Sequence, residues 1–192
     1  MSGSFEDRLN QILPRITSDD FLKSKGLGNE IGFWVFDYPP ERELDVRQFL
    51  SGTIEPALAK SVPAIRHKTV NLFDLAIGLL EERKLLDKAI DLQVRKGDQA
   101  VLKELQAVLK EDRLAERLTK DTDVAGINMF ILTGVGAVYP LLRTHTLLSA
   151  LHAQVENKPV LMFYPGRYDG YSLRLFNKLA DDHYYRAFRL VP

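Results

Sequence analysis

The side chains best suited to chemistry follow four runs of mostly apolar residues. The four segments are Asp37 with Tyr38, Asn71 with Asp74, residues 133–136 and residues 164–169. If each run is a strand of one parallel sheet, the carboxyl ends of the strands meet at a single edge. Open α/β sheets bind their ligands at that edge. We therefore expect these segments to form the functional edge of the molecule.

Acidic side chains at this edge raise a catalytic hypothesis. Carboxylates such as those of Asp37, Asp74 and Asp169 are ligands that a magnesium ion prefers. With His145 as a general base, Asp37 and Asp169 would give a metal-dependent phosphoesterase or nuclease. These residues belong to different predicted elements, and the sequence does not establish that they converge. We therefore assign no catalytic residue and no metal ligand.

Arg143, His145 and His152 lie in one predicted helix, residues 139–156. The two histidines are seven positions apart, so their backbones differ in height by roughly 10 Å. Two bonds of about 2 Å cannot bridge that separation to a shared metal ion. The pattern favours structural roles for both histidines.

A glycine turn follows the third apolar run, where backbone amides could hold a phosphate. A P-loop consists of a glycine, four further residues and then Gly-Lys-Ser/Thr. The residues after Gly136 are Ala-Val-Tyr-Pro, without the lysine or the Ser/Thr of that motif. The dinucleotide fingerprint also fails, because Tyr139 occupies the place of its third glycine. Gly134 and Gly136 therefore indicate a tight strand-to-helix turn. A small-ligand or nucleotide sensor is the alternative, and we assign no cofactor.

The densest unusual segment runs from Tyr164 to Asp169 and continues toward Arg174. A structural interpretation makes it an ordered loop, residues 165–170, held by an ion pair between Arg167 and Asp169. A functional interpretation makes it a docking loop, since arginine and tyrosine are favoured anchors of protein interfaces. We expect Arg167 and Tyr168 to contribute to complex formation.

Composition narrows the class of protein. The chain has 192 residues with 26 basic and 26 acidic side chains, a net charge of zero, and no cysteine. The absence of cysteine excludes disulfides, thiolate metal sites and a cysteine nucleophile. Without a basic excess, direct binding of nucleic acid is not expected. The apolar runs are too short for a membrane span and no secretory signal is recognisable, so we expect a cytoplasmic protein.

The apolar patterns predict alternating strands and helices. We expect strands at 31–36, 65–72, 129–133, 159–164 and 184–191, with the last at or near an edge. We expect helices at 5–13, 40–56, 73–95, 98–109 and 139–156, and a short helix at 173–179. Pro14 should close the first helix, and Pro56 should end or kink the second. The pattern predicts one α/β domain over residues 1–192.

The predicted domain has three layers, with a mostly parallel sheet between helices on both faces, Rossmann-like or similar to a degenerate P-loop fold. Residues 1–25 form a helical lead-in, and residues 73–119 form an enlarged helical crossover. Candidate interaction or ligand-edge residues are Asp37, Tyr38, Gly134, Gly136, Arg143, His145, Tyr164, Arg167, Tyr168, Asp169 and Arg174.

Four blocks of the chain, in order, resemble the BrxB family of BREX phage-exclusion systems, formerly a domain of unknown function. They are GLGNE at 26–30 with FDYPP at 36–40; TGVG at 133–136 with YP at 139–140 and RTH at 143–145; FYPG at 163–166 with YDG at 168–170 and LRLF at 173–176; and YYRAF at 184–188 with RL at 189–190. The resemblance covers nearly the whole chain.

This resemblance implies a role in a defence system that protects bacteria from phage. It implies a small non-enzymatic adaptor or assembly factor acting beside a large ATPase, a methyltransferase and a phosphatase-like PglZ protein. PglZ and the ATPase are the implied partners. No motif of the family carries a catalytic role over to this chain.

Overall fold

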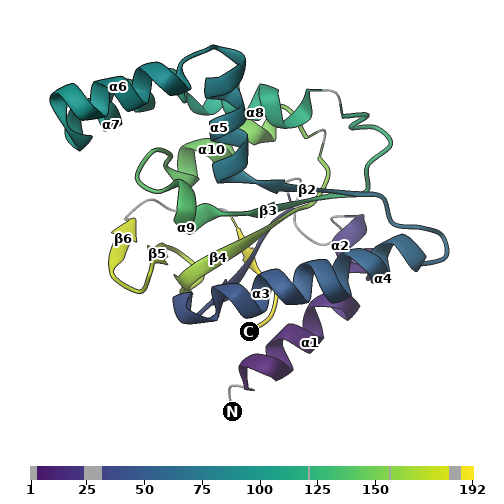
Figure 1. Ribbon diagram of the computed structural model, residues 1–192. Helices are drawn as coiled ribbons and strands as arrows, with labels where there is room; N and C mark the ends of the chain where they lie inside the picture. Colours follow the sequence, from purple (N-terminus) through teal and green to yellow (C-terminus); the bar gives the residue numbers. More distant parts are fainter. Residues whose placement is uncertain (1–3, 24–31, 121, 156, 182–186) are drawn as a thin grey trace.

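A mostly parallel sheet forms the centre of the molecule. The computed structural model describes residues 4–23, 32–120, 122–155, 157–181 and 187–192. Five parallel strands follow the order β2-β3-β4-β1-β7, and two short antiparallel strands extend from the end of β4 (Figure 1). Their bounds are β1 Phe33–Tyr38, β2 His67–Asn71, β3 Met129–Thr133, β4 Val160–Tyr168, β5 Leu173–Leu175, β6 Leu179–Asp181 and β7 Phe188–Arg189.

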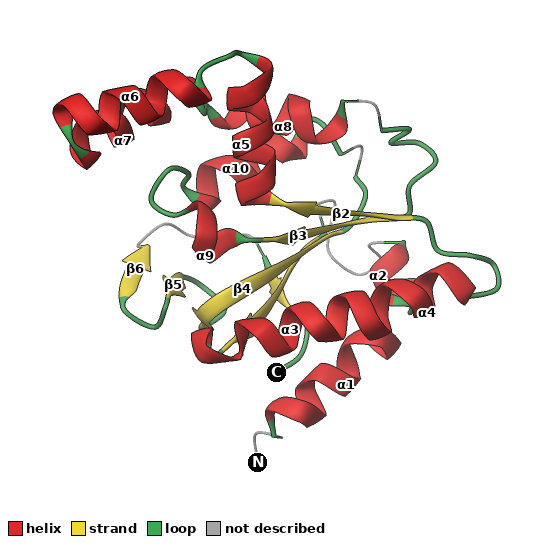
Figure 2. Ribbon diagram, in the orientation of Figure 1, coloured by secondary structure: helices red, strands yellow, loops and turns green. Residues whose placement is uncertain are grey.

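Helices cover both faces of this sheet (Figure 2). One layer consists of α1 Phe5–Ile16, α2 Asp19–Leu22, η1 Pro40–Arg42, α3 Glu43–Phe49, η2 Leu50–Ile54 and α4 Glu55–Lys60. The other consists of α5 Leu72–Glu82, α8 Glu111–Thr119, α9 Val135–Val138 and α10 Thr144–His152. A helical hairpin, α6 Leu86–Lys96 with α7 Asp98–Val108, projects from the second layer. No described helix is long and apolar enough to cross a membrane.

The central strands are buried on both faces, because their alternate side chains enter two separate cores. In β3, Phe130 and Leu132 pack with α5, α8, α9 and α10, whereas Met129 and Ile131 pack with the layer of α1 to α4. The same alternation occurs in β1 and β4. Two-sided burial explains why these runs are apolar throughout. The predicted three-layer α/β architecture, and interior positions for these three strands, are confirmed.

Two predictions near the C-terminal third are wrong. The expected loop at 165–170 is largely strand, because β4 runs on to Tyr168 and gains β5 as a new partner beyond the end of β1. The expected helix at 173–179 is a β5–β6 hairpin instead. Its turn places Phe176 and Asn177 at φ angles of 53° and 60°, in the left-handed region. The final strand, β7 at Phe188–Arg189, does lie at the sheet edge beside β1. Residues 184–186 of the expected strand lie outside the described residues.

Several helix boundaries also differ from the sequence-based expectation. Helix α1 continues past Pro14 to Ile16. The expected helix 73–95 breaks after Glu82, and Lys84 adopts a φ of 54° there. The segment around Pro56 stays helical, since a π turn at Leu50–Ile54 precedes it and accommodates the missing N–H.

The predicted helix 139–156 is shorter than expected, because α10 begins only at Thr144 and ends at His152. Gly97 ends α6 with a φ of 79°, as expected of a glycine stop. The predicted turn at residues 26–29 lies outside the described residues.

Candidate functional site

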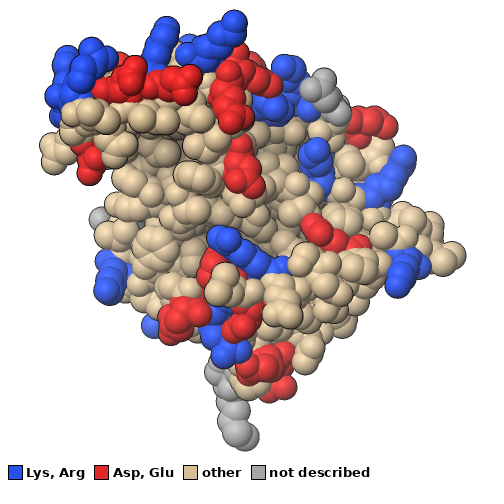
Figure 3. Space-filling view, viewed as in Figure 1, with Lys and Arg blue, Asp and Glu red and all other residues tan. Residues whose placement is uncertain are grey.

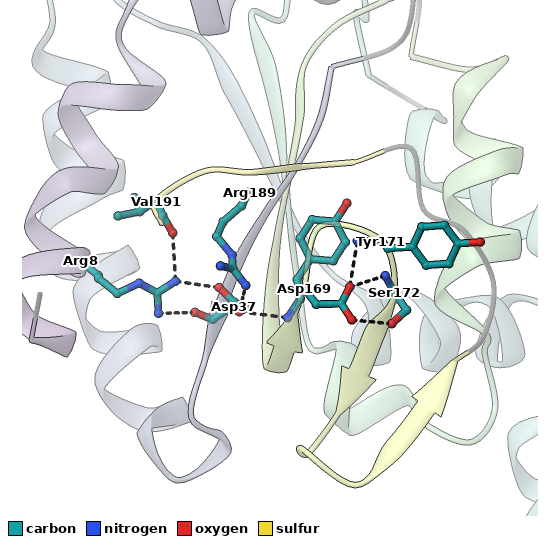
Figure 4. A network of polar contacts seen from close by, with 8 residues as sticks. Arg8, Asp37, Asp169, Tyr171, Ser172, Arg189 and Val191 are labelled. Atoms are coloured by element: carbon teal, nitrogen blue, oxygen red, sulfur yellow. Dashed lines mark hydrogen bonds and ion pairs between the residues drawn. The ribbon is translucent and has the colours of Figure 1, made fainter. Parts of the chain in front are cut away.

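Asp37, at the carboxyl end of β1, is held by groups from three distant parts of the chain (Figure 4). The Nη2 atom of Arg8 lies 2.7 Å from one carboxylate oxygen, and Nη2 of Arg189 lies 3.3 Å from the other. The backbone amide of Tyr168 donates to that second oxygen at 3.0 Å. The residue is only 6% exposed. Asp37 is thus a buried anion that two arginines neutralise.

Arg8 extends this network to the end of the described chain. Its Nη1 atom donates to the backbone carbonyl of Asp37 at 2.9 Å, and its Nη2 atom also donates to the backbone carbonyl of Val191 at 3.1 Å. The guanidinium lies over the ring of Phe36, 5.0 Å from its centre. The side chain therefore joins α1, β1 and the segment after β7, which is a structural task.

Tyr38 is a buried phenol whose proton is held in place. Its hydroxyl donates to Oε2 of Glu43 at 2.5 Å. Burial raises the pKa of Tyr38 well above its ordinary value, and the hydrogen bond to the Glu43 carboxylate raises it further. Tyr38 stays protonated at neutral pH, so it can donate a hydrogen bond but cannot act as a base.

Tyr164 and Tyr168 are core residues, exposed by only 3% and 1%. The Tyr168 hydroxyl donates to the carbonyl of Ala187 at 2.6 Å, which ties the end of β4 to the segment before β7. This burial gives no support to the expectation that Tyr168 contacts a partner. Tyr171, in the turn after β4, is 59% exposed.

Asp169 organises the turn between β4 and β5. Its carboxylate accepts from the backbone amides of Tyr171 and Ser172, at 2.9 and 2.7 Å, and from the Ser172 hydroxyl at 3.0 Å (Figure 4). The amide of Ser172, followed by that of Tyr171, lowers the pKa of Asp169 below its ordinary value. Within the described residues, no ion pair joins Asp169 to Arg167. Hydrogen bonds of Asp169 within the turn hold this segment in place of the predicted ion pair.

The glycine turn after β3 is filled by protein atoms. Gly134 has a φ of 73°, and a Cβ atom there would collide with the side chain of Asn71, which caps α5. A Cβ atom on Gly136 would lie 2.8 Å from the ring of Phe176 and 3.1 Å from Pro165. Both glycines therefore serve close packing between α5, α9 and the β4–β5 hairpin.

The structure brings part of the predicted set together around two neighbouring cavities. One has a volume of about 280 Å³ and is lined by Arg8, Asp37, Tyr38, Pro39, Gly166, Arg167, Asn177, Arg189 and Pro192. The other has a volume of about 390 Å³ and is lined by Arg167, Asp169, Ser172, Arg174 and Asn177. Arg167 and Asn177 line both, so the cavities adjoin along the β4–β5 hairpin.

Other predicted residues lie elsewhere. Arg143 is exposed just before α10 and does not line these cavities. The backbone of His145 belongs to α10, and its side chain lies outside what the structure describes. Asp37 and Asp169 use separate sets of hydrogen-bond partners. In the part of the chain that the structure describes, no three His, Asp or Glu side chains gather as a metal site would require.

Sequence reasoning missed Arg8 and Asn177. Arg8 precedes Leu9 in an amphipathic helix, where a charged residue is typical of a solvated face, so its reach to Asp37 leaves no pattern. Asn177 carries a weak signal, because asparagine tolerates the left-handed conformation that tight hairpin turns need.

Comparison with known proteins gives consistent matches over the chain. The family model described as "BrxB: BREX protein BrxB" matches residues 68–190. A BREX protein BrxB of Escherichia coli O9:H4 (strain HS) is 43% identical over 189 residues, covering 97% of this chain and 92% of the relative. A BREX protein BrxB of Bacillus cereus (strain H3081.97) is 40% identical over 194 residues, covering 96% of each chain. No solved structure matches.

Proposed function

Because the chain belongs to the BrxB family, and is thus a component of a BREX anti-phage system, we propose that it is a non-enzymatic adaptor that binds other BREX proteins. Its partners on this proposal are the phosphatase-like PglZ protein and the large BREX ATPase, and it acts in the cytoplasm. Family membership is the observation that carries the proposal.

The candidate catalytic carboxylates already have partners within the protein, which supports an adaptor over an enzyme. Asp37 is neutralised by Arg8 and Arg189, and Asp169 is used by a turn. A general base must be free to take a proton, and a metal ligand must have its oxygens free for the ion. Neither carboxylate meets these conditions, so the phosphoesterase or nuclease alternative gains no support. The filled glycine turn likewise gives none to a nucleotide sensor.

Surface composition also fits a binding role. Figure 3 shows a broad area without charged side chains between the α6–α7 hairpin and α3, with acidic and basic groups intermixed around it. Large apolar side chains exposed on the protein include Leu44 of α3, 74% exposed, and Phe73 of α5, 37% exposed. Wide uncharged areas with exposed apolar groups are typical of protein interfaces.

The test is capture from cells that carry the complete BREX gene cluster. A tagged copy of this chain should retain PglZ or the ATPase through washing, and the purified proteins should then bind directly in calorimetry. Purified protein that shows turnover of a phosphoester, together with failure to bind either partner, would contradict the adaptor role.

A further inference from the structure

Arg167 of β4 and Arg174 of β5 face each other directly across the antiparallel pair. Side chains opposed in this way have Cβ atoms only about 5 Å apart, and like charges there repel. Both side chains are exposed. Among the described residues, neither arginine has a hydrogen bond or an ion pair from its side chain, unlike Arg8 and Arg189. The hairpin therefore presents two adjacent cations that lack an anion.

The hairpin is built to hold this arrangement. Gly166 is needed because a Cβ atom there would collide with the carbonyl of Arg174, so only glycine lets the two strands approach. Asp169 closes the turn on one side, and Asn177 closes the next turn with a φ of 60°. Among the described residues that line the two cavities, both acids are already committed: Asp37 to two arginines, Asp169 to amides of its turn. The positive charge of the arginine pair remains available.

The residues that line the cavities indicate which class of anion the two arginines would bind. The described residues that line the cavity of about 390 Å³ are Arg167, Asp169, Ser172, Arg174 and Asn177, none of them apolar or aromatic. These described lining residues offer a nucleobase no aromatic ring to stack on. Two arginines on a chain of zero net charge do not make the extended basic surface that duplex DNA requires. Arginine forks instead match a single carboxylate or phosphate group.

We infer that Arg167 and Arg174 form a docking site for aspartate or glutamate side chains of a partner protein. This inference rests on the adaptor role and gives that role a location. Two exposed arginines on a hairpin whose turn carries Tyr171, 59% exposed, have the composition of an interface anchor. A carboxylate of the partner, bound between the two guanidinium groups, would offset their mutual repulsion.

The first experiment measures binding of purified PglZ and purified ATPase by calorimetry. Doubly substituted protein, Arg167→Ala with Arg174→Ala, should bind about tenfold to a hundredfold more weakly than the wild type. Arg83→Ala with Arg95→Ala removes the same charge from exposed positions elsewhere and should bind normally. Unchanged melting temperatures would show that all proteins are folded. Normal binding by the folded Arg167/Arg174 variant would overturn the inference while leaving the adaptor role intact.

A second experiment does not depend on those partners. Isotope-labelled protein is titrated with a hexaglutamate peptide and, separately, with inorganic phosphate, and amide signals of residues 166–175 are followed by NMR. The peptide should shift these signals in the wild type and in the Arg83/Arg95 control but not in the Arg167/Arg174 variant. Absence of a shift with the peptide, or a tighter response to phosphate than to the peptide, would overturn a carboxylate site. Failure of both partners to bind, with the peptide response present, would overturn the adaptor role alone.

Discussion

Asp37 joins α1, β1, the end of β4 and β7 through one carboxylate. Asp37→Asn keeps the shape of the side chain but leaves the charges of Arg8 and Arg189 without their anion. Breaking a buried ion pair in this way costs about 3–5 kcal/mol. Because Arg189 is 34% exposed and water screens it, we expect a loss of about 2–4 kcal/mol in the free energy of unfolding, measured with urea.

The matched control for that measurement is Asp45→Asn. Asp45 pairs with Arg42 at 2.8 Å, but the two side chains are 50% and 38% exposed. Pairs at the surface contribute at most about 1 kcal/mol. If Asp45→Asn destabilised the protein as much as Asp37→Asn, the network around Asp37 would not be the tie between the termini that its geometry indicates.

A second prediction at this scale concerns the acid dependence of the β4–β5 turn. Amides of Ser172 and Tyr171 lower the pKa of Asp169 in the folded protein, so the ionised form favours folding. This contribution is fully present above the ordinary value of 3.8 and is lost as pH falls through the lower folded pKa. An NMR titration should therefore give a midpoint for Asp169 below 3.8. The stability advantage over Asp169→Ala should shrink as the solution becomes more acidic, and a constant advantage would contradict the assignment.

At the scale of elements, the glycine turn locks α5, α9 and β3 together. Gly134→Ala adds a Cβ atom at a φ of 73° and against Asn71, the cap of α5. We expect a loss of about 1–3 kcal/mol in the free energy of unfolding, because strain and a weakened cap add. Gly78→Ala, in α5 with open space around it, should instead stabilise by about 0.5–1 kcal/mol. Equal effects of the two substitutions would argue against a packing role for Gly134.

The α6–α7 hairpin should open more readily than the rest of the structure. Neither helix has a buried residue, and Val94 is 84% exposed. Elements with few buried contacts exchange their amide hydrogens through local opening. Hydrogen exchange measured by mass spectrometry should therefore be fastest, among the helices compared, in residues 86–108 and far slower in β3 and β4. Protection of the hairpin equal to that of β3 would indicate that another surface covers it in solution.

For the molecule as a whole, we predict no turnover of ATP by the purified chain. The turn after β3 lacks the lysine and hydroxyl of a P-loop, and Phe176 and Pro165 pack against it. Release of phosphate from ATP with magnesium should therefore equal the rate without protein. Turnover that Gly136→Ala abolishes, in a variant that stays folded, would contradict this prediction.

Much of this architecture could be predicted from sequence, because two-sided burial leaves a clear pattern. Residues 129–133 and 160–163 are apolar at every position or nearly so, and both are central strands. The β5 strand was missed because Leu173, Leu175 and Phe176 also fit helical spacing, and only the partner strand decides between the two. The family resemblance, which rests on motifs over the whole chain, is confirmed by the matched relatives.

The candidate site was less accessible to sequence reasoning. Asp37 and Arg167 were expected at one edge and do line one cavity. Tyr168 looked like a contact residue because its neighbours are charged, but its position in β4 turns the ring into the core. The reach of Arg8 across to Asp37 depends on how α1 packs on the sheet. No spacing in the sequence encodes such a tertiary contact.

The position of β1 in the sheet has a consequence for protein synthesis. It is the first of the described strands to leave the ribosome, yet it lies between β4 and β7, the last two of the five parallel strands in chain order. Until residues 160–168 have emerged, the apolar segment Phe33–Tyr38 has neither of its neighbours to pair with. Unpaired apolar strands invite aggregation, and long-range pairing slows folding. We therefore expect that a ribosome stalled before residue 160 would leave this apolar segment exposed and prone to aggregation.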